Sequence, residues 1–301
     1  MPHHIGLDIG GTKIAGGVFT PDGALLNELV VSTPHDYAAF LKSCADIVQQ
    51  LEQKTDHSCT VGIGIAGRID HSLGGIGKWG GRPFLEGKAL RHELGALLNR
   101  EVRLANDANC MALAEVVDGA GAGFTSVVGL IIGTGVGAGF VYKGQVVEGL
   151  NGMTGDLGHL PLPYREEKDG PVVQCACGQR GCIDKTISGP ALARLYTFMT
   201  GKESGAKAIA DLACANDAEA LRVLDQYFET VAKATVTILQ SFDPDVIVVG
   251  GGLNALPGLY EEVPKRWGKY ALVPHPKTQF VPARHGPMSG MRGAAWLWRE
   301  D

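Results

Sequence analysis

One histidine and three cysteines are spaced so that they can share one metal ion. The cysteines follow the pattern C-x-C-x₄-C, and the four candidate ligands are His159, Cys175, Cys177 and Cys182. Three thiolates and one imidazole suit tetrahedral Zn²⁺, and four protein ligands leave no position for a catalytic water. The alternatives are free thiols or a redox pair, but C-x-C lacks the two-residue spacing of the usual redox motif. The pattern therefore predicts a structural zinc site.

A second segment combines, within six residues, groups that can hold a phosphate and a magnesium ion. Backbone N–H groups in a glycine turn can surround phosphate oxygens, a hydroxyl adds a donor, and a carboxylate can bind Mg²⁺ directly or through water. The segment does not match the Walker-type phosphate loop, G-x-x-x-x-G-K-[ST]. Its candidate residues are Asp8, Gly10, Gly11, Thr12 and Lys13.

Two further glycine clusters follow apolar runs later in the chain. The alternative for the Asp8–Lys13 segment or the Gly133 cluster alone is a tight hairpin that binds no ligand, because glycine also serves turns that need its backbone freedom. Three such clusters in one chain favour phosphate binding over three unrelated hairpins. The candidate residues are Gly133, Thr134, Gly135 and Gly137 in one cluster, and Gly250, Gly251 and Gly252 in the other.

The pair Asn106-Asp107 lies after a short apolar run and before a helical pattern. Asp107 has the position of a helix N-cap, which stabilises a helix by about 1 kcal/mol. The alternative is a general base that takes the proton of a hydroxyl as that hydroxyl attacks a phosphate. The residues alone favour the cap.

These groups must be positioned by the elements that precede and follow them. Four apolar runs, beginning at Ile5, Val61, Val127 and Val246, end in glycine clusters and are typical of buried strands. Apolar residues spaced three and four apart predict helices over 37–53, 109–117 and 218–239. Alternating strands and helices indicate an α/β protein, and the similar strand–turn–strand units after Ile5 and Val127 suggest a duplicated architecture.

Composition narrows the class of protein. The chain has 301 residues and a net charge of −5, with scattered Lys and Arg, which does not favour a nucleic-acid or membrane-surface partner. No signal-peptide pattern is evident, and the apolar runs are shorter than a membrane span, so a cytoplasmic protein is expected. The remaining cysteines are predicted to be buried thiols: Cys44, Cys59, Cys110 and Cys214.

In their order along the chain, these motifs resemble those of the ROK sugar kinases. The resemblance extends from residue 5 to the C-terminal tail and so covers nearly the whole chain. It is carried by the loop Asp8–Lys13, the pair Asn106-Asp107, Gly155-Asp156-Leu157-Gly158-His159, the cysteine cluster ending in Gly181-Cys182-Ile183-Asp184, and the tail Arg284-His285-Gly286…Gly293-Ala294-Ala295.

The resemblance implies a two-domain α/β fold of the actin/hexokinase-like (ribonuclease H-like) type, with ATP and sugar in the interdomain cleft. The N-terminal domain would comprise residues 1–118 and be completed by a C-terminal helix over 289–301. The C-terminal domain would comprise residues 119–288 and contain the zinc-binding insertion.

The resemblance also assigns roles. Asp107 becomes the catalytic base, which reverses the preference for a cap, and the loops at Asp8–Lys13 and Gly133–Gly137 flank the phosphates of Mg²⁺·ATP, with Gly251 and Gly252 near the adenosine. His159 would serve the metal and the sugar through its two ring nitrogens. The implied sugar-lining residues are Gly67, Asn106, Asp107, Asp156, His159 and Asp184.

Two features depart from the family pattern. Asp156 and Asp184 stand where the family usually has Glu. The loop Lys78–Pro83 lacks the Asn that many relatives carry before this proline.

The expected reaction is ATP-dependent phosphorylation of N-acetyl-D-glucosamine at the 6-hydroxyl, because Val102–Cys110, Tyr260–Arg266 and Gly290–Ala295 are most similar to family members that act on that sugar. A fructose or mannose kinase is the alternative. A sugar-responsive regulator of the family would carry a DNA-binding helix-turn-helix ahead of the loop at Asp8. The expected partners are ATP and the sugar, and no nucleic-acid or membrane partner is expected. The sequence does not decide whether the protein forms a homodimer.

Overall fold

The computed structural model describes residues 2–55, 57–78 and 83–299. The chain divides into two compact units. The first comprises Met1–Gly123, Gly139–Thr154 and His285–Asp301, and the second comprises Phe124–Ala138 and Gly155–Arg284. The first unit thus includes 139–154, a segment that was predicted to belong to the C-terminal domain. The predicted domain boundaries stay a prediction.

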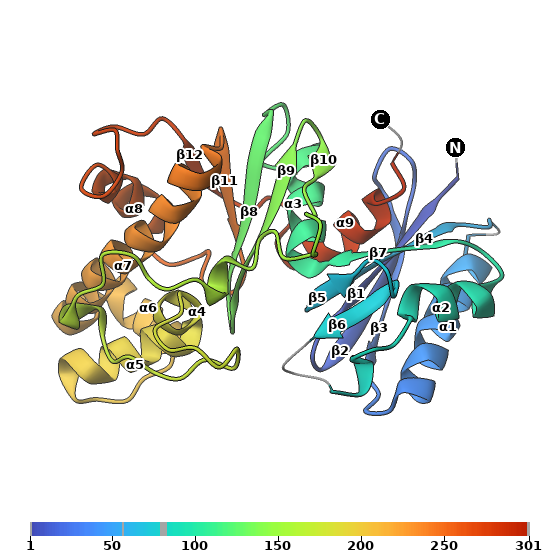
Figure 1. Ribbon diagram of the computed structural model, residues 1–301, viewed down its shortest axis with the longest axis horizontal. Helices are drawn as coiled ribbons and strands as arrows, with labels where there is room; N and C mark the ends of the chain where they lie inside the picture. Colours follow the sequence, from blue (N-terminus) through green and yellow to red (C-terminus); the bar gives the residue numbers. More distant parts are fainter. Residues whose placement is uncertain (1, 56, 79–82, 300–301) are drawn as a thin grey trace. The chain divides into compact units, whose positions relative to one another are not determined.

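The first unit is built on a five-stranded sheet (Figure 1). Its first three strands form antiparallel hairpins, whereas the last two run parallel to β1 and are reached through helical crossovers. The carboxyl ends of β1, β4 and β7 therefore lie at the same edge. The strand order is β3 (Leu25–Ser32), β2 (Lys13–Phe19), β1 (His4–Ile9), β4 (Thr60–Ile65) and β7 (Val102–Asn106).

Helices complete this unit. The predicted helix over 37–53 is confirmed as α1 (Tyr37–Gln53), whose buried face packs on the sheet and whose N-cap is Asp36. The helix predicted over 109–117 begins earlier, as α3 (Asp107–Asp118). The other elements are β5 (Arg68–Asp70), β6 (Gly75–Lys78), η1 (Pro83–Leu85), α2 (Leu90–Leu98), β10 (Gln145–Val146), η4 (Gly286–Met288) and α9 (Ser289–Trp296).

Two strand glycines allow α9 to lie directly on the sheet. A Cβ at Gly6 would come within 1.8 Å of the Met291 carbonyl oxygen, and one at Gly62 within 1.8 Å of the Ala294 carbonyl oxygen. Only glycine permits so close an approach of helix and strand backbones. The C-terminal helix therefore packs against β1 and β4, and its first turn reaches the end of β1 (Figure 1).

The second sheet repeats the first. Its order is β10, β9 (Val136–Tyr142), β8 (Ser126–Ile132), β11 (Val246–Gly250) and β12 (Gln279–Pro282), again with a hairpin from β8 to β9 and parallel β11 and β12. The boundary between the units falls within β9, between Ala138 and Gly139. The repeated order confirms the α/β class and the duplicated architecture that the glycine clusters suggested.

The helices of the second unit include α7, which runs from Ala218 to Phe242 and so extends three residues beyond the predicted end. No helix among the described residues is long and apolar enough to cross a bilayer. The other elements are η2 (Leu157–His159), η3 (Glu167–Asp169), α4 (Asp184–Ile187), α5 (Gly189–Thr200), α6 (Ala206–Cys214) and α8 (Leu259–Trp267).

The cysteine prediction is confirmed at three positions and wrong at one. Cys44, Cys59 and Cys110 are buried, whereas Cys214 is exposed at the end of α6. Helix α6 buries only one face, and the apolar pattern of so short a helix does not reveal on which side its last residue falls.

Candidate functional site

Two carboxylates of the first unit interact at the edge of its sheet. Asp8 lies near the end of β1, and Asp107 begins α3, directly after β7. The Asp8 carboxylate lies against the first turn of α9, where a Cβ at Gly290 would come within 2.8 Å of its Oδ2. Burial, and then the negative charge of Asp107, raise the pKa of Asp8 from 3.8 to about 6, against the opposing charge of Lys13. Such a pair can bind a cation and accept a proton.

The structure corrects the assignment of the helix cap. Asn106, not Asp107, is the N-cap of α3, and its Oδ1 accepts a hydrogen bond of 2.8 Å from the backbone N–H of Ala108. Its Nδ2 donates to the carbonyl oxygen of Gly67 at 3.1 Å. Asp107 follows as the first helical residue, and its Oδ1 also accepts from Ala108 N at 2.9 Å. Since a neighbour provides the cap, Asp107 is not needed for that role.

The turn between β1 and β2 is closed by its own backbone. Gly10 N donates to the carbonyl oxygen of Lys13 at 3.0 Å, and the buried Thr33 binds the turn twice: its Oγ1 donates to Gly10 O at 3.2 Å and its N–H to Thr12 O at 3.1 Å. Gly11, Thr12 and Lys13 are exposed. Their N–H, hydroxyl and ammonium groups therefore lie on an ordered, accessible turn beside Asp8, as a phosphate site requires.

Two glycine turns of the second unit lie against each other at the ends of β8 and β11. The first is closed by a bond of 2.9 Å from Gly133 N to Gly135 O. Gly251 has a φ of +86°, and a Cβ there would come within 2.5 Å of the Ile132 carbonyl oxygen, so this position requires glycine. Gly189 N, at the start of α5, donates to Gly133 O at 2.8 Å. The structure thus brings Gly133–Gly137 and Gly250–Gly252 together, as parallel neighbouring strands predict.

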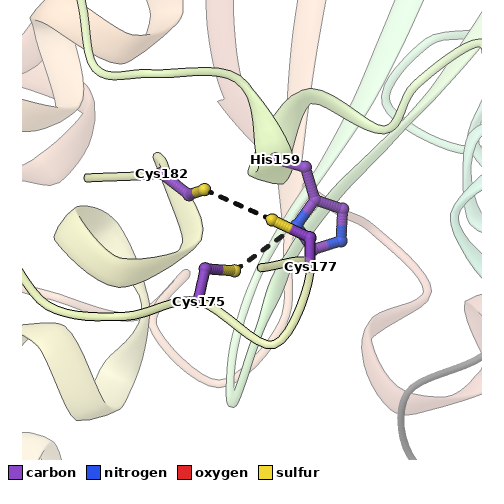
Figure 2. A group of neighbouring side chains, drawn as sticks. All are labelled: His159, Cys175, Cys177 and Cys182. Carbon is purple, nitrogen blue, oxygen red and sulfur yellow. Dashed lines mark hydrogen bonds between the residues drawn. The ribbon is translucent and has the colours of Figure 1, made fainter. Parts of the chain in front are cut away.

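The four predicted metal ligands form one group. Their ligand atoms lie within 4.8 Å of one another, and in Figure 2 the imidazole and the three sulfurs point toward a common centre. The Cys177 and Cys182 sulfurs are 3.6 Å apart, and Cys175 Sγ is 3.6 Å from His159 Nδ1. Tetrahedral zinc requires about 3.8 Å between two sulfur ligands and about 3.6 Å between sulfur and nitrogen. The donor set and its spacing both fit Zn²⁺.

A tight loop aims the sulfurs. Gly178 has a φ of +91° and donates to the carbonyl oxygen of Cys175 at 3.0 Å, which reverses the chain between the paired cysteines. A hydrogen bond with the Gln179 backbone lowers the pKa of Cys177, whereas burial and the neighbouring thiols raise the pKa of Cys182 to about 12. Because each thiolate opposes ionisation of the next, a cation is needed to hold all three deprotonated.

The remaining predicted sugar residues of the second unit differ in their surroundings. Asp156 is exposed at the start of η2, and His159, also exposed, directs Nδ1 to Cys175. Asp184 is buried: its Oδ1 accepts from Val136 N at 2.9 Å, and its Oδ2 pairs with Lys185 Nζ at 2.8 Å. Both Asp184 oxygens therefore have partners within this unit. Of the loop Lys78–Pro83, residues 79–82 lie outside the described residues.

The roles of three residues at or near the site were not predicted from the sequence. Thr33 holds the first glycine turn, and Gly290 makes room for the Asp8 carboxylate. The pKa of Cys110 on α3 is raised by burial, by Asp8 and Asp107, and to a smaller extent by the negative charge of Glu148. Glu148 Oε2 is also 3.6 Å from His71 Nδ1. No local motif marks Thr33 or Glu148, and the tail motif that contains Gly290 does not reveal its contact with Asp8, which arises only from the packing of α9.

Known proteins are similar to this chain over nearly its whole length. The sequence profile of the ROK family matches residues 4–301. The N-acetyl-D-glucosamine kinase of Haemophilus influenzae is 38% identical over 98% of this chain and 99% of its own length. A ROK hexokinase from Thermus thermophilus is 34% identical with a TM-score of 0.84, covering 97% of this chain and 96% of that one. A Streptomyces griseus ROK glucokinase, solved with glucose and AMPPNP, is 26% identical with a TM-score of 0.81 over 98% of both chains.

Proposed function

This chain belongs to the ROK family, and we propose that it transfers the γ-phosphoryl group of ATP to the 6-hydroxyl of N-acetyl-D-glucosamine. The fold is the two-domain actin/hexokinase-like fold of the ROK sugar kinases. The observation that carries the phosphoryl transfer is the pair Asp8 and Asp107, one carboxylate with a pKa of about 6 and the other at the first residue of a helix that Asn106 caps. The choice of sugar is supported by the N-acetyl-D-glucosamine kinase that is 38% identical to this chain.

We assign proton transfer to Asp107. The 6-hydroxyl gives its proton to the Asp107 carboxylate as its oxygen attacks the γ-phosphorus, and the bond to the bridging oxygen breaks to release ADP. Asp8 would hold the Mg²⁺ that accompanies ATP, and Gly10 to Lys13 would bind phosphate oxygens. Gly67 and Asn106, which are joined by the hydrogen bond from Asn106 Nδ2 to the Gly67 carbonyl oxygen, would bind the sugar.

In the second unit, Gly133, Thr134, Gly135 and Gly137 would bind phosphate through the turn, and Gly251 and Gly252 would lie near the adenosine. Asp156 and the Nε2 of His159 would bind sugar hydroxyls. The metal group would hold a structural zinc ion, which supplies no chemistry to the transfer itself but fixes the segments around His159 and Cys175–Cys182.

The choice of acceptor is tested with a panel of sugars. We expect N-acetyl-D-glucosamine to give the highest kcat/KM in a coupled ADP-release assay that also includes N-acetylmannosamine, glucose, mannose and fructose. An acetamido group brings one donor and one acceptor, and a site that pairs both disfavours sugars that lack them. A higher kcat/KM for fructose or mannose would replace this assignment with a kinase for that sugar.

The metal assignment is tested separately. Protein purified without added zinc should contain about one Zn per chain, and Cys177→Ser should lose it and melt at a lower temperature, because the metal joins two chain segments. Cys214→Ser is the matched control, since Cys214 is exposed and outside the group. Parent protein that contains no zinc, or a Cys177→Ser variant that retains it with unchanged melting, would refute the assignment.

A further inference from the structure

We propose that the metal group acts on the nucleotide side of the reaction: it fixes Gly158 and Asp184, which hold Val136 of the glycine turn, so that metal occupancy controls nucleotide affinity. The inference rests on the proposed function, in which Gly133–Gly137 binds phosphate. It assigns Asp184 a role other than the sugar contact that the family resemblance implied. Asp184 becomes a positioning residue for the phosphate turn.

Asp184 holds the turn at a backbone N–H. Its Oδ1 accepts from Val136 N at 2.9 Å, and a Cβ at Gly135 would lie 3.1 Å from the same oxygen. The Asp184 side chain is only 12% exposed, so water competes weakly for this bond. A carboxylate that accepts from a backbone N–H makes one of the stronger hydrogen bonds available to a protein.

Gly158 holds the turn from the other side of the same residue. Its Cα lies so close to the Val136 carbonyl oxygen that a Cβ would come within 2.1 Å. Gly158 is itself buried, and Ala138, two residues along β9, donates its N–H to Gly155 O at 2.9 Å. Val136 is therefore bonded at its N–H to one segment and packs at its C=O directly against the other.

Both segments lead directly to metal ligands. Gly158 precedes His159, and Asp184 follows Cys182 by two residues. Between the ligands the segments are joined by two backbone bonds, from Ile183 N to Leu160 O at 2.9 Å and from Leu162 N to Gly181 O at 3.2 Å. A metal bound to His159 and Cys182 fixes the distance between the two contacts on Val136. Without the metal, the backbone link between the segments there is the short bridge that these two bonds form around Pro161 and Cys182.

The experiment measures nucleotide and sugar binding independently. Dissociation constants for Mg²⁺·AMPPNP and for N-acetyl-D-glucosamine are measured by calorimetry on the parent, Asp184→Ala, Gly158→Ala and Cys177→Ser, with zinc content measured on each. Lys185→Met and Gly205→Ala are the controls. The first removes the partner of Asp184 Oδ2 but keeps the bond to Val136, and the second adds a methyl group where no atom lies within 4 Å.

We expect Asp184→Ala to keep its zinc and to bind Mg²⁺·AMPPNP about 10-fold or more weakly, because a part-buried N–H loses its acceptor. Gly158→Ala and Cys177→Ser should also bind Mg²⁺·AMPPNP more weakly than the parent. The affinity of Asp184→Ala for N-acetyl-D-glucosamine should change less than threefold. Unchanged nucleotide affinity in Asp184→Ala, or a loss confined to the sugar, would overturn the inference and restore the sugar contact. A parent protein that binds no nucleotide would instead refute the proposed function.

Discussion

Replacing Asp107 by Asn is expected to lower kcat by about 10²–10⁴-fold, because the variant removes the proton acceptor and the negative charge beside the attacking hydroxyl. The change preserves the size of the side chain, and an Asn side-chain oxygen can still accept from Ala108 N, as Asp107 Oδ1 does at 2.9 Å. The cap of α3 is provided by Asn106 and is untouched. Stability and sugar affinity should therefore change little, as measured by thermal melting and calorimetry.

The neighbouring residue gives the matched control. Asn106→Ala removes the cap and its bond to Gly67, and should cost about 1 kcal/mol of stability. A loss of kcat in Asp107→Asn with parental melting is the signature of a base, whereas a loss of stability in Asn106→Ala is the signature of a cap. An Asp107→Asn enzyme within about threefold of the parent rate would fall well short of the expected loss and would exclude the base.

Asp8→Asn is expected to make the protein more stable and less active. The pKa of Asp8 is raised from 3.8 to about 6, chiefly by burial and then by Asp107. At neutral pH the ionised carboxylate therefore destabilises the ligand-free fold by roughly 3 kcal/mol relative to its neutral form. Asn removes that charge, so we expect a higher Tm at pH 7.5, and a kcat lower by about 10²-fold or more because the Mg²⁺ ligand is lost.

The pH dependence distinguishes this account from a general packing effect. Because the folded state binds the Asp8 proton more tightly than the unfolded chain, the protonated carboxyl stabilises the fold fully below about pH 4, and this contribution is lost as pH rises through about 6. The gain in Tm of Asp8→Asn should therefore shrink between pH 7.5 and pH 5, measured without Mg²⁺ or nucleotide. Asp46→Asn, which alters an exposed pair with Lys42, is the control. A gain independent of pH would contradict the burial argument.

The strands of the two sheets show how far sequence patterns reach. Apolar runs that end in glycine predicted two strands in each sheet and suggested the duplicated architecture, because a buried strand and a tight turn each demand particular residue types. The sequence also predicted which four side chains come together as candidate metal ligands, since the cysteines are close in sequence and their donor chemistry admits few alternatives.

The N-cap of α3 and the contact between Asp184 and Val136 could not be predicted in the same way. Asn and Asp are nearly equal as N-caps, so residue type does not decide between the adjacent Asn106 and Asp107. The cap is the residue just before the first helical one, and its position depends on where β7 ends. The bond from Val136 to Asp184 joins residues 48 positions apart, and no local pattern encodes it. The contact of Gly290 with Asp8 likewise depends on α9 packing against the first strands.

The central claim is that this enzyme phosphorylates the 6-hydroxyl of N-acetyl-D-glucosamine at the expense of ATP. The most direct test is to incubate the purified protein with Mg²⁺·ATP and the sugar and to identify the product by phosphorus–proton correlation NMR while ADP is quantified. We predict one product, whose phosphorus couples to the two protons on carbon 6, formed in equal amount with ADP. Phosphate on another hydroxyl, or ADP released without phosphorylated sugar, would contradict the account.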